Sequence, residues 1–431
     1  MLAYFVTILA ELVILRFIQS NPIQIDSTGL CWGMIGIASL VFLITIIQEK
    51  DNKFVLTMIG SYLFRISLLI FDLYGRNIFV LPNSGLDSEL FQRESLCYAL
   101  NGGDVSMTAK TFGLFYRYFG EHRIYLQYLN LVLSILTLYI IWLILKKLDL
   151  DKKIRHTVFY ITAFLPNYAI LSVILLRESI IIFLLTCSMY FFVEWWKHHK
   201  NSAFILAVLL SLLAAMYHSG GITNAVGYVL IYILYDTRGQ KYQLSFKTFL
   251  FSLLFFLGFF YLFNHYGNTF FSYVDNVNSL DDITRKVVDA GGGGSGYDYI
   301  GGANIDSLGE LILYSPIRMF YFIASPLPWM WRGINDMIAF LFSALFYLTS
   351  LYMGFQVLFQ RMHSKNKNLI FALILICVIG MALFAWGVSN AGTALRHRDK
   401  FLIDYVILFA VSYQEYLNSH HTKHKITTRG A

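Results

Sequence analysis

The chain has 431 residues, of which 57% are hydrophobic and only 14% are charged, against about 25% charged residues in a typical soluble domain. This composition excludes a disordered protein, a collagen and a disulfide scaffold, and it excludes an ordinary soluble enzyme almost as firmly. The net charge of +7 indicates neither an orientation nor a binding partner until the charges are assigned to the two sides of a bilayer. The four cysteines form no CxxC pair and no His/Cys cluster, so the sequence predicts no metal site.

Twelve runs of the sequence qualify as membrane spans, which need about 20 mostly apolar residues. They cover residues 2–18, 29–48, 54–72, 122–146, 157–176, 179–196, 203–217, 220–236, 246–264, 336–359, 368–389 and 400–416. Lipid offers backbone groups no hydrogen-bond partners, so such runs must be helical. The sequence therefore predicts an all-α, polytopic integral membrane protein with about twelve transmembrane helices. The first run lacks a signal-peptide pattern, and we expect it to be retained.

The short basic loops predict the orientation, because cytoplasmic loops are enriched in Lys and Arg. Loops 49–53, 146–155, 197–200, 238–247 and 361–367 fall on one side if both termini are cytoplasmic. A weaker apolar piece, residues 308–330, then forms a re-entrant or surface helix, in keeping with its prolines. We expect one transmembrane domain over residues 1–417, with larger external segments at 73–121 and 265–335, and a basic cytoplasmic tail at 418–431.

With this orientation, lysine predominates among the cytoplasmic cations and arginine among the external ones. Guanidinium is always charged and forks onto phosphate or carboxylate, so a population of external arginines indicates anion binding at the outer face. The alternative is that these arginines snorkel, or pair with external acids such as Asp72, Glu121 and Asp336.

The first external segment contains a turn at residues 82–85, after which Asp87 is expected to cap a helix that runs through Glu94 and beyond. Glu89 and Arg93 are spaced as an i,i+4 pair on that helix. Either Asp87 or Glu89 is a candidate general base facing a lipid-linked substrate, and the alternative is a capped, solvated helix. A second amphipathic stretch, residues 108–119, is expected to lie on the membrane surface.

Two further candidates stand at the outer ends of predicted spans. Arg177 and Glu178 lie between two spans with almost no loop, which is costly unless they pair or line a polar cavity. Arg177 would hold a phosphate, and Glu178 would orient it or accept a proton. His218 is followed by two glycines, which allow close approach of the backbone to a ligand, and its proton is labile near neutral pH. A structural ion pair and a simple hydrogen-bonding histidine are the alternatives.

The second external segment combines a glycine run with proline, tryptophan and arginine. Arg285 precedes the glycines at 291–294, which could form a mobile lid, and Asp281-Asp282 is weak evidence for a metal. Tryptophans next to arginines suit sugar stacking beside a phosphate clamp, and an interfacial aromatic belt is the alternative. The candidate residues there are Arg318, Trp329, Trp331 and Arg332.

The strongest local signal lies between the last two predicted spans, in a short external turn at residues 389–400. Arg396, His397, Arg398 and Lys400 place three cations and a histidine within five residues. This placement runs against the positive-inside tendency. Arg396 and Arg398 are therefore candidate anion ligands.

This layout resembles the Wzy-type polymerases of bacterial O-antigen, capsule and exopolysaccharide repeat units. The resemblance covers most of the chain: about a dozen spans, arginine-bearing external loops and a basic tail. Locally it depends on the stretches 176–179, 325–329 and 390–398. Arg285 and Gly296 also fit the Arg-x10-Gly pattern of that family, whereas Arg177 and Arg318 do not.

The resemblance implies glycosyl transfer without a metal or another cofactor. A growing glycan on polyprenyl diphosphate would move onto a lipid-linked repeat unit at the outer face of the bacterial cytoplasmic membrane. Arg177, Arg318, Arg396 and Arg398 would bind the diphosphate, and Glu178, His218, Asp87 or Glu89 would activate the acceptor hydroxyl. Arg93, Arg285, Arg332, Trp329 and Trp331 complete the candidate substrate-binding set. The expected partners are lipid-linked oligosaccharide, membrane lipids and other polysaccharide-assembly proteins, with no nucleic acid.

Two other functions fit the sequence less well. A GT-C glycosyltransferase using a polyprenyl-phosphate monosaccharide carries its acid after the first span, whereas Asp87 and Glu89 follow the third. A flippase of lipid-linked glycans predicts inverted repeats and charges spread through midplane helices. No internal repeat is found, and few charges besides Glu11 and Arg65 lie within the spans.

Overall fold

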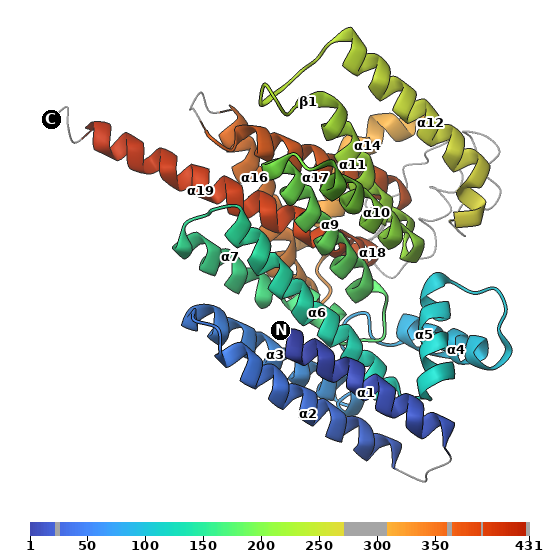
Figure 1. Cartoon of the computed structure of the whole chain (residues 1–431). Coiled ribbons are helices and arrows are strands. Elements are labelled where there is room, and N and C mark those ends of the chain that lie inside the picture. Colours follow the sequence, from blue (N-terminus) through green and yellow to red (C-terminus); the bar gives the residue numbers. More distant parts are fainter. Residues whose placement is uncertain (22–25, 271–307, 360–363, 389–390, 428–431) are drawn as a thin grey trace. The chain divides into compact units, whose positions relative to one another are not determined.

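The computed structural model describes residues 1–21, 26–270, 308–359, 364–388 and 391–427. Apart from one small hairpin, the regular structure of these residues is helical (Figure 1), which confirms an all-α fold. Within the described residues, seven helical segments are long and apolar enough to cross a membrane. They are Leu2–Ser20, Ser27–Ile47, Asn52–Tyr74, Arg123–Lys147, Glu178–His198, Ile334–Phe359 and Lys367–Ala385. The chain is therefore an α-helical membrane protein, while the number of twelve spans stays a prediction.

The chain folds into two compact units. Unit 1 comprises Met1–Tyr139 and Phe159–Phe183, and unit 2 comprises Ile140–Val158 and Leu184–Ala431. The boundaries between them fall inside three helices, α6 (Arg123–Lys147), α7 (Lys152–Ala163) and α9 (Glu178–His198).

Unit 1 is built on long apolar helices. Its remaining elements are α1 (Leu2–Ser20), α2 (Ser27–Ile47), α3 (Asn52–Tyr74), α4 (Leu86–Asn101), α5 (Met107–Phe119) and α8 (Pro166–Leu171). The helices α1, α2 and α3 run side by side (Figure 1). Asp26 starts α2 by accepting hydrogen bonds from the Thr28 and Gly29 amides. The helices α4 and α5 pack together, and α5 also packs on α1. Its Phe112 and Tyr116 are buried, so part of the apolar face of α5 packs on protein. Its position on a membrane surface stays a prediction.

The run 157–176, predicted as one span, is an interrupted helix. The helix α7 ends at Ala163 and Pro166 starts the short helix α8, because proline cannot continue the hydrogen-bond ladder. The carbonyls freed by the interruptions are bound by side chains. Arg65 donates to the Ala163 carbonyl at 2.8 Å. After α8, Asn130 donates to the carbonyls of Ile174 and Leu176 at 2.9 and 3.1 Å. Protein side chains thus replace the partners that lipid lacks.

Unit 2 is built around two of its helices, α17 (Lys367–Gly387) and α19 (Leu402–Thr427). They pack on each other and on α16 (Leu345–Phe359) (Figure 1). Its other helices are α10 (Asn201–Tyr217), α11 (Ile222–Leu234), α12 (Phe246–Phe270), α14 (Leu308–Ala324), α15 (Ile334–Ile338) and α18 (Ala391–Arg398). Short 3-10 turns η1 (Ser219–Gly221), η2 (Pro328–Met330) and η4 (Asp399–Phe401), and a π-helical turn η3 (Ala339–Ala344), connect them. The strands β1 (Tyr235–Asp236) and β2 (Lys241–Tyr242) form an antiparallel hairpin.

Several helices of unit 2 are interrupted near polar residues. The helix α10 gives way to η1 at His218, α14 ends before Ser325, and α18 passes through η4 into α19. The predicted external turn 389–400 is thus mainly a short helix, α18, followed by η4. These interruptions place helix ends next to ionisable side chains, His218 and Arg398 among them.

Candidate functional site

The residues predicted to carry chemistry divide between the two units. Unit 1 contains Asp87, Glu89, Arg93, Arg177 and Glu178, and unit 2 contains His218, Arg318, Trp329, Trp331, Arg332, Arg396 and Arg398. Arg285, together with Asp281, Asp282 and the glycine run, lies outside the described residues.

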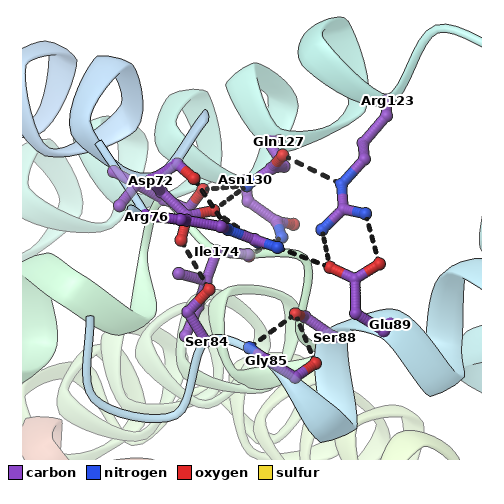
Figure 2. A network of polar contacts seen from close by, with 11 residues as sticks. Asp72, Arg76, Ser84, Gly85, Ser88, Glu89, Arg123, Gln127, Asn130 and Ile174 are labelled. Carbon is purple, nitrogen blue, oxygen red and sulfur yellow. Dashed lines mark hydrogen bonds and ion pairs between the residues drawn. The ribbon is translucent and has the colours of Figure 1, made fainter. Parts of the chain in front are cut away.

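In unit 1, Glu89 is held by two arginines (Figure 2). Arg123 contacts both carboxylate oxygens, with its two terminal nitrogens at 2.8 and 2.7 Å. Arg76 donates to the same carboxylate at 2.6 Å. These hydrogen bonds, that from Arg123 first, lower the pKa of Glu89 from 4.5 to about 2. A carboxylate with so low a pKa is a weak general base, so its position favours a structural role.

A second carboxylate, Asp72, anchors this network from the end of α3. It is fully buried and accepts hydrogen bonds from Ser84 at 2.5 Å, from Gln127 at 2.8 Å and from Arg76 at 3.2 Å (Figure 2). Gln127 also donates to the Val173 carbonyl at 2.9 Å, which lies in the irregular segment after α8. The network therefore ties α3, α4 and α6 to that segment.

The Glu89 ion pairs should make unit 1 sensitive to acid. The folded-state pKa of Glu89 lies below its ordinary value, so the stabilisation is complete above about pH 4.5 and is lost as the pH falls toward 2. Water screens the partly exposed carboxylate, so we expect a contribution of about 1 kcal/mol or less. Thermal unfolding in detergent should show a smaller loss of stability in this pH range for Glu89→Gln than for the wild type. Glu121→Gln, at an exposed position, serves as the control and should behave like the wild type.

The other candidates of unit 1 are close in sequence to this network but differ in environment. The helix α4 begins one residue before Asp87, after Gly85, whose amide donates to Ser88. Asp87 is exposed in the first turn and does not cap the helix as expected. Arg93 is exposed. Arg177 lies 5.8 Å from the centre of the Phe91 ring, and Glu178 is buried as the first residue of α9, where a helix dipole favours negative charge.

In unit 2, three aromatic rings from different elements meet at the end of α17. The His218 ring stacks on Phe384 at 5.5 Å between centroids, and the His397 ring meets His218 edge-on at 4.7 Å. Phe384 and His397 are 5.5 Å apart. Arg318 of α14 donates to the carbonyl of Ala385, the next residue, at 2.8 Å. We call His218, Arg318, Phe384 and His397 the dihistidine cluster.

Arg398 lies immediately after the second histidine and is fully buried. It donates to the Ser343 hydroxyl at 3.1 Å, to the Ile323 carbonyl at 3.0 Å, and to the carbonyls of Ser325 and Ala339. Arg398 thus joins the end of α14 to the π-helical turn η3. Its neighbour Arg396 is only half-buried, which makes Arg396 the more accessible of the two for a ligand.

The tryptophan–arginine stretch of unit 2 is mostly at the surface. The Trp329 side chain is exposed, while Trp331 donates to the Pro326 carbonyl at 3.1 Å and packs on Phe340. The backbone amide of exposed Arg332 donates to the Asp336 carboxylate at the start of α15. These contacts describe a locally ordered surface element and leave the sugar-stacking role a prediction.

Some polar residues of both sites were not singled out from the sequence. Arg76 and Arg123 were counted only among the external arginines, and their partner Glu89 lies 13 and 34 residues away. Asp404 of α19 is fully buried and accepts from Asn224 of α11 at 2.9 Å. A buried acid within an apolar run is a usable signal, because such residues are rare in membranes unless they serve a purpose. Phe384 carries no such signal.

Among the described residues, no three His, Cys, Asp or Glu side chains are grouped so that they could hold a metal ion. Comparisons with protein-family models, with curated proteins and with solved structures give no match.

Proposed function

We propose that this chain is a membrane polysaccharide polymerase that transfers a glycan from polyprenyl diphosphate onto a lipid-linked repeat unit at the outer face of the membrane. The observation that carries the proposal is the dihistidine cluster and its basic neighbours. Arg396, Arg398 and Lys400 lie on α18 and η4 with a single carboxylate, Asp399, in the same two elements. In these two elements the cations outnumber the carboxylates by three to one, and the guanidinium fork suits an anionic group at the end of a lipid.

The reaction needs three kinds of chemical help. The acceptor hydroxyl oxygen forms a bond to the anomeric carbon, while the bond from that carbon to the diphosphate oxygen breaks. The electron pair of the broken bond leaves with the diphosphate, and the hydroxyl proton passes to a base. The protein must therefore bind the diphosphate, stabilise its growing charge and accept one proton.

The residues of unit 2 match these needs to different degrees. Arg396 is accessible and cationic, and it suits direct binding of the diphosphate. Arg318 and Arg398 use part of their hydrogen-bonding capacity on backbone carbonyls, so they contribute positive charge while fixing the helix ends. The two histidines provide ring nitrogens that can donate or accept hydrogen bonds.

Replacing Arg396 by alanine is the decisive test. Because hydrogen bonds to charged groups contribute about 1.5–3 kcal/mol, we expect undecaprenyl diphosphate to bind the full chain in lipid nanodiscs about 10- to 100-fold more weakly. Cells that depend on this chain should also make shorter polysaccharide. Arg238→Ala, which changes an exposed arginine in the turn of the β-hairpin, is the matched control.

Unchanged affinity and unchanged polymer length in Arg396→Ala would remove the main support for the proposal. A comparison of donors separates it from single-sugar transfer: the polymerase should use repeat units on polyprenyl diphosphate, and a GT-C enzyme should use single sugars on polyprenyl phosphate. Uptake of neither donor, with translocation of lipid-linked glycan across vesicles, would instead show a flippase.

A further inference from the structure

We infer that His218 acts as a neutral hydrogen-bond donor to the leaving diphosphate, and not as the base that activates the acceptor. This inference rests on the proposed function and assigns a role within it. The observation is a hydrogen bond from the Gly220 backbone amide to Nδ1 of His218, with a length of 3.1 Å. A ring nitrogen that accepts an amide proton carries no proton of its own, so the proton of the neutral ring is on Nε2.

The turn that presents the amide is fixed on several sides. His218 is both the C-cap residue of α10 and the N-cap residue of η1. Its carbonyl accepts a hydrogen bond from the Gly221 amide at 2.8 Å. Ser211 donates to the Gly221 carbonyl at 2.6 Å, and Thr223 donates to the Gly220 carbonyl at 2.9 Å. Because the turn is held by α10 and α11, the amide stays directed at Nδ1.

The packing around the turn leaves little room for another backbone path. A Cβ atom on Gly221 would lie 2.6 Å from the Ala215 backbone nitrogen, and one on Gly220 would lie 1.7 Å from Phe384. Both positions therefore need glycine, because the Ala215 backbone and the Phe384 ring approach too closely for a side chain. The same Phe384 ring stacks on His218 and so restricts rotation of the imidazole.

The contacts of the ring oppose a proton on Nδ1. The elements that pack on η1 are α10, α11 and α17. The second histidine, His397, meets the His218 ring at 4.7 Å between centroids. A proton on Nδ1 would remove the acceptor of the Gly220 hydrogen bond and add a positive charge beside the His397 ring.

A neutral imidazole in this state has a definite chemical use. Its Nε2–H can donate to the diphosphate oxygen that gains charge as the glycosidic bond breaks, and no proton needs to be transferred. The hydroxyl proton must then go to a different group. His397 is the neighbouring titratable side chain, 4.7 Å away between ring centroids.

The test uses His218→Asn in the full chain in lipid nanodiscs. Asparagine is among the best N-cap residues, so its side-chain oxygen should still accept from the Gly220 amide while the Nε2–H is lost. We expect this variant to keep the fold and to bind undecaprenyl diphosphate about 10- to 100-fold more weakly. His122→Asn, a histidine of unit 1 that bonds Ser27, is the control and should bind like the wild type.

The outcomes separate the possible roles. If His218 is the base for the acceptor, His218→Asn should bind undecaprenyl diphosphate with normal affinity and make no polymer. That result would overturn the inference. Nitrogen NMR of the histidine-labelled protein should show Nε2 protonated and Nδ1 unprotonated for the signal that disappears in His218→Asn. A protonated Nδ1 near neutral pH would also overturn it. Absence of undecaprenyl diphosphate binding by the wild type would instead contradict the proposed function itself.

Discussion

Replacement of Arg398 by alanine is expected to lower the free energy of unfolding by about 4 kcal/mol or more, the largest stability effect that we predict. The side chain is fully buried and links α18 to the end of α14, through Ile323 and Ser325, and to η3, through Ala339. Its loss leaves buried carbonyls without their donor, and each unsatisfied group costs about 1–3 kcal/mol. Thermal unfolding of the purified chain in detergent measures the effect.

Two variants locate the origin of this effect. Arg398→Lys keeps the charge but has one nitrogen in place of a planar fork, so it should recover only part of the stability. Arg396→Ala removes a half-buried neighbour and should cost about 1 kcal/mol or less. An unfolding temperature for Arg398→Ala equal to that of the wild type would show that other groups hold these carbonyls. Because Arg398→Ala is expected to destabilise the fold, a loss of polymer in that variant does not separate binding from folding. Arg396→Ala is the better test of function.

Replacement of Gly220 by alanine is expected to abolish most activity and to destabilise unit 2 by about 1–3 kcal/mol, as overpacking does in well-packed interiors. The added Cβ would lie 1.7 Å from Cζ and 2.0 Å from Cε2 of Phe384. Phe384 is buried between His218, His397 and Phe401, so its ring cannot move without disturbing both histidines. Polymer formation and thermal unfolding should both report the change.

A double variant distinguishes this clash from a loss of backbone freedom. In Gly220→Ala combined with Phe384→Ala, the space for the new methyl group is restored, so the two effects on stability should not add. Gly36→Ala is the matched control, because a Cβ there would contact nothing within 4 Å. Additive effects in the double variant would mean that Phe384 is not what excludes a side chain at position 220.

Arginines at interrupted helices are a recurrent feature of both units. Arg65 binds the last carbonyl of α7, Arg318 binds a carbonyl near the end of α17, and Arg398 binds those at the end of α14. The negative end of the helix dipole favours a cation at each place. Inside an apolar protein the freed carbonyls also need donors that water would otherwise supply. A buried arginine in such a chain is thus not by itself evidence of a ligand site.

Some of the candidate chemistry could be predicted from local sequence and some could not. His218 and the stretch Arg396–Arg398 were recognisable because cations and a glycine turn are unusual at the ends of apolar runs. That His397 would meet His218, across 179 residues of sequence, depends on how η1 and α18 both pack on Phe384 of α17. In the same way, no residue near Glu89 in sequence indicates that Arg123 would bind its carboxylate and lower its pKa, which makes Glu89 a weak base.

The sequence by itself determined that the chain is an α-helical membrane protein, because the length and apolar character of a span are local properties set by bilayer thickness and backbone hydrogen bonding. It also indicated which external stretches carry unusual charge. Only the tertiary structure decided what each charge does: Glu89 binds two arginines, Arg398 binds backbone carbonyls, and His218 accepts the amide of Gly220. Those roles depend on partners brought together by helix packing and helix interruptions, and a linear pattern does not encode such distances.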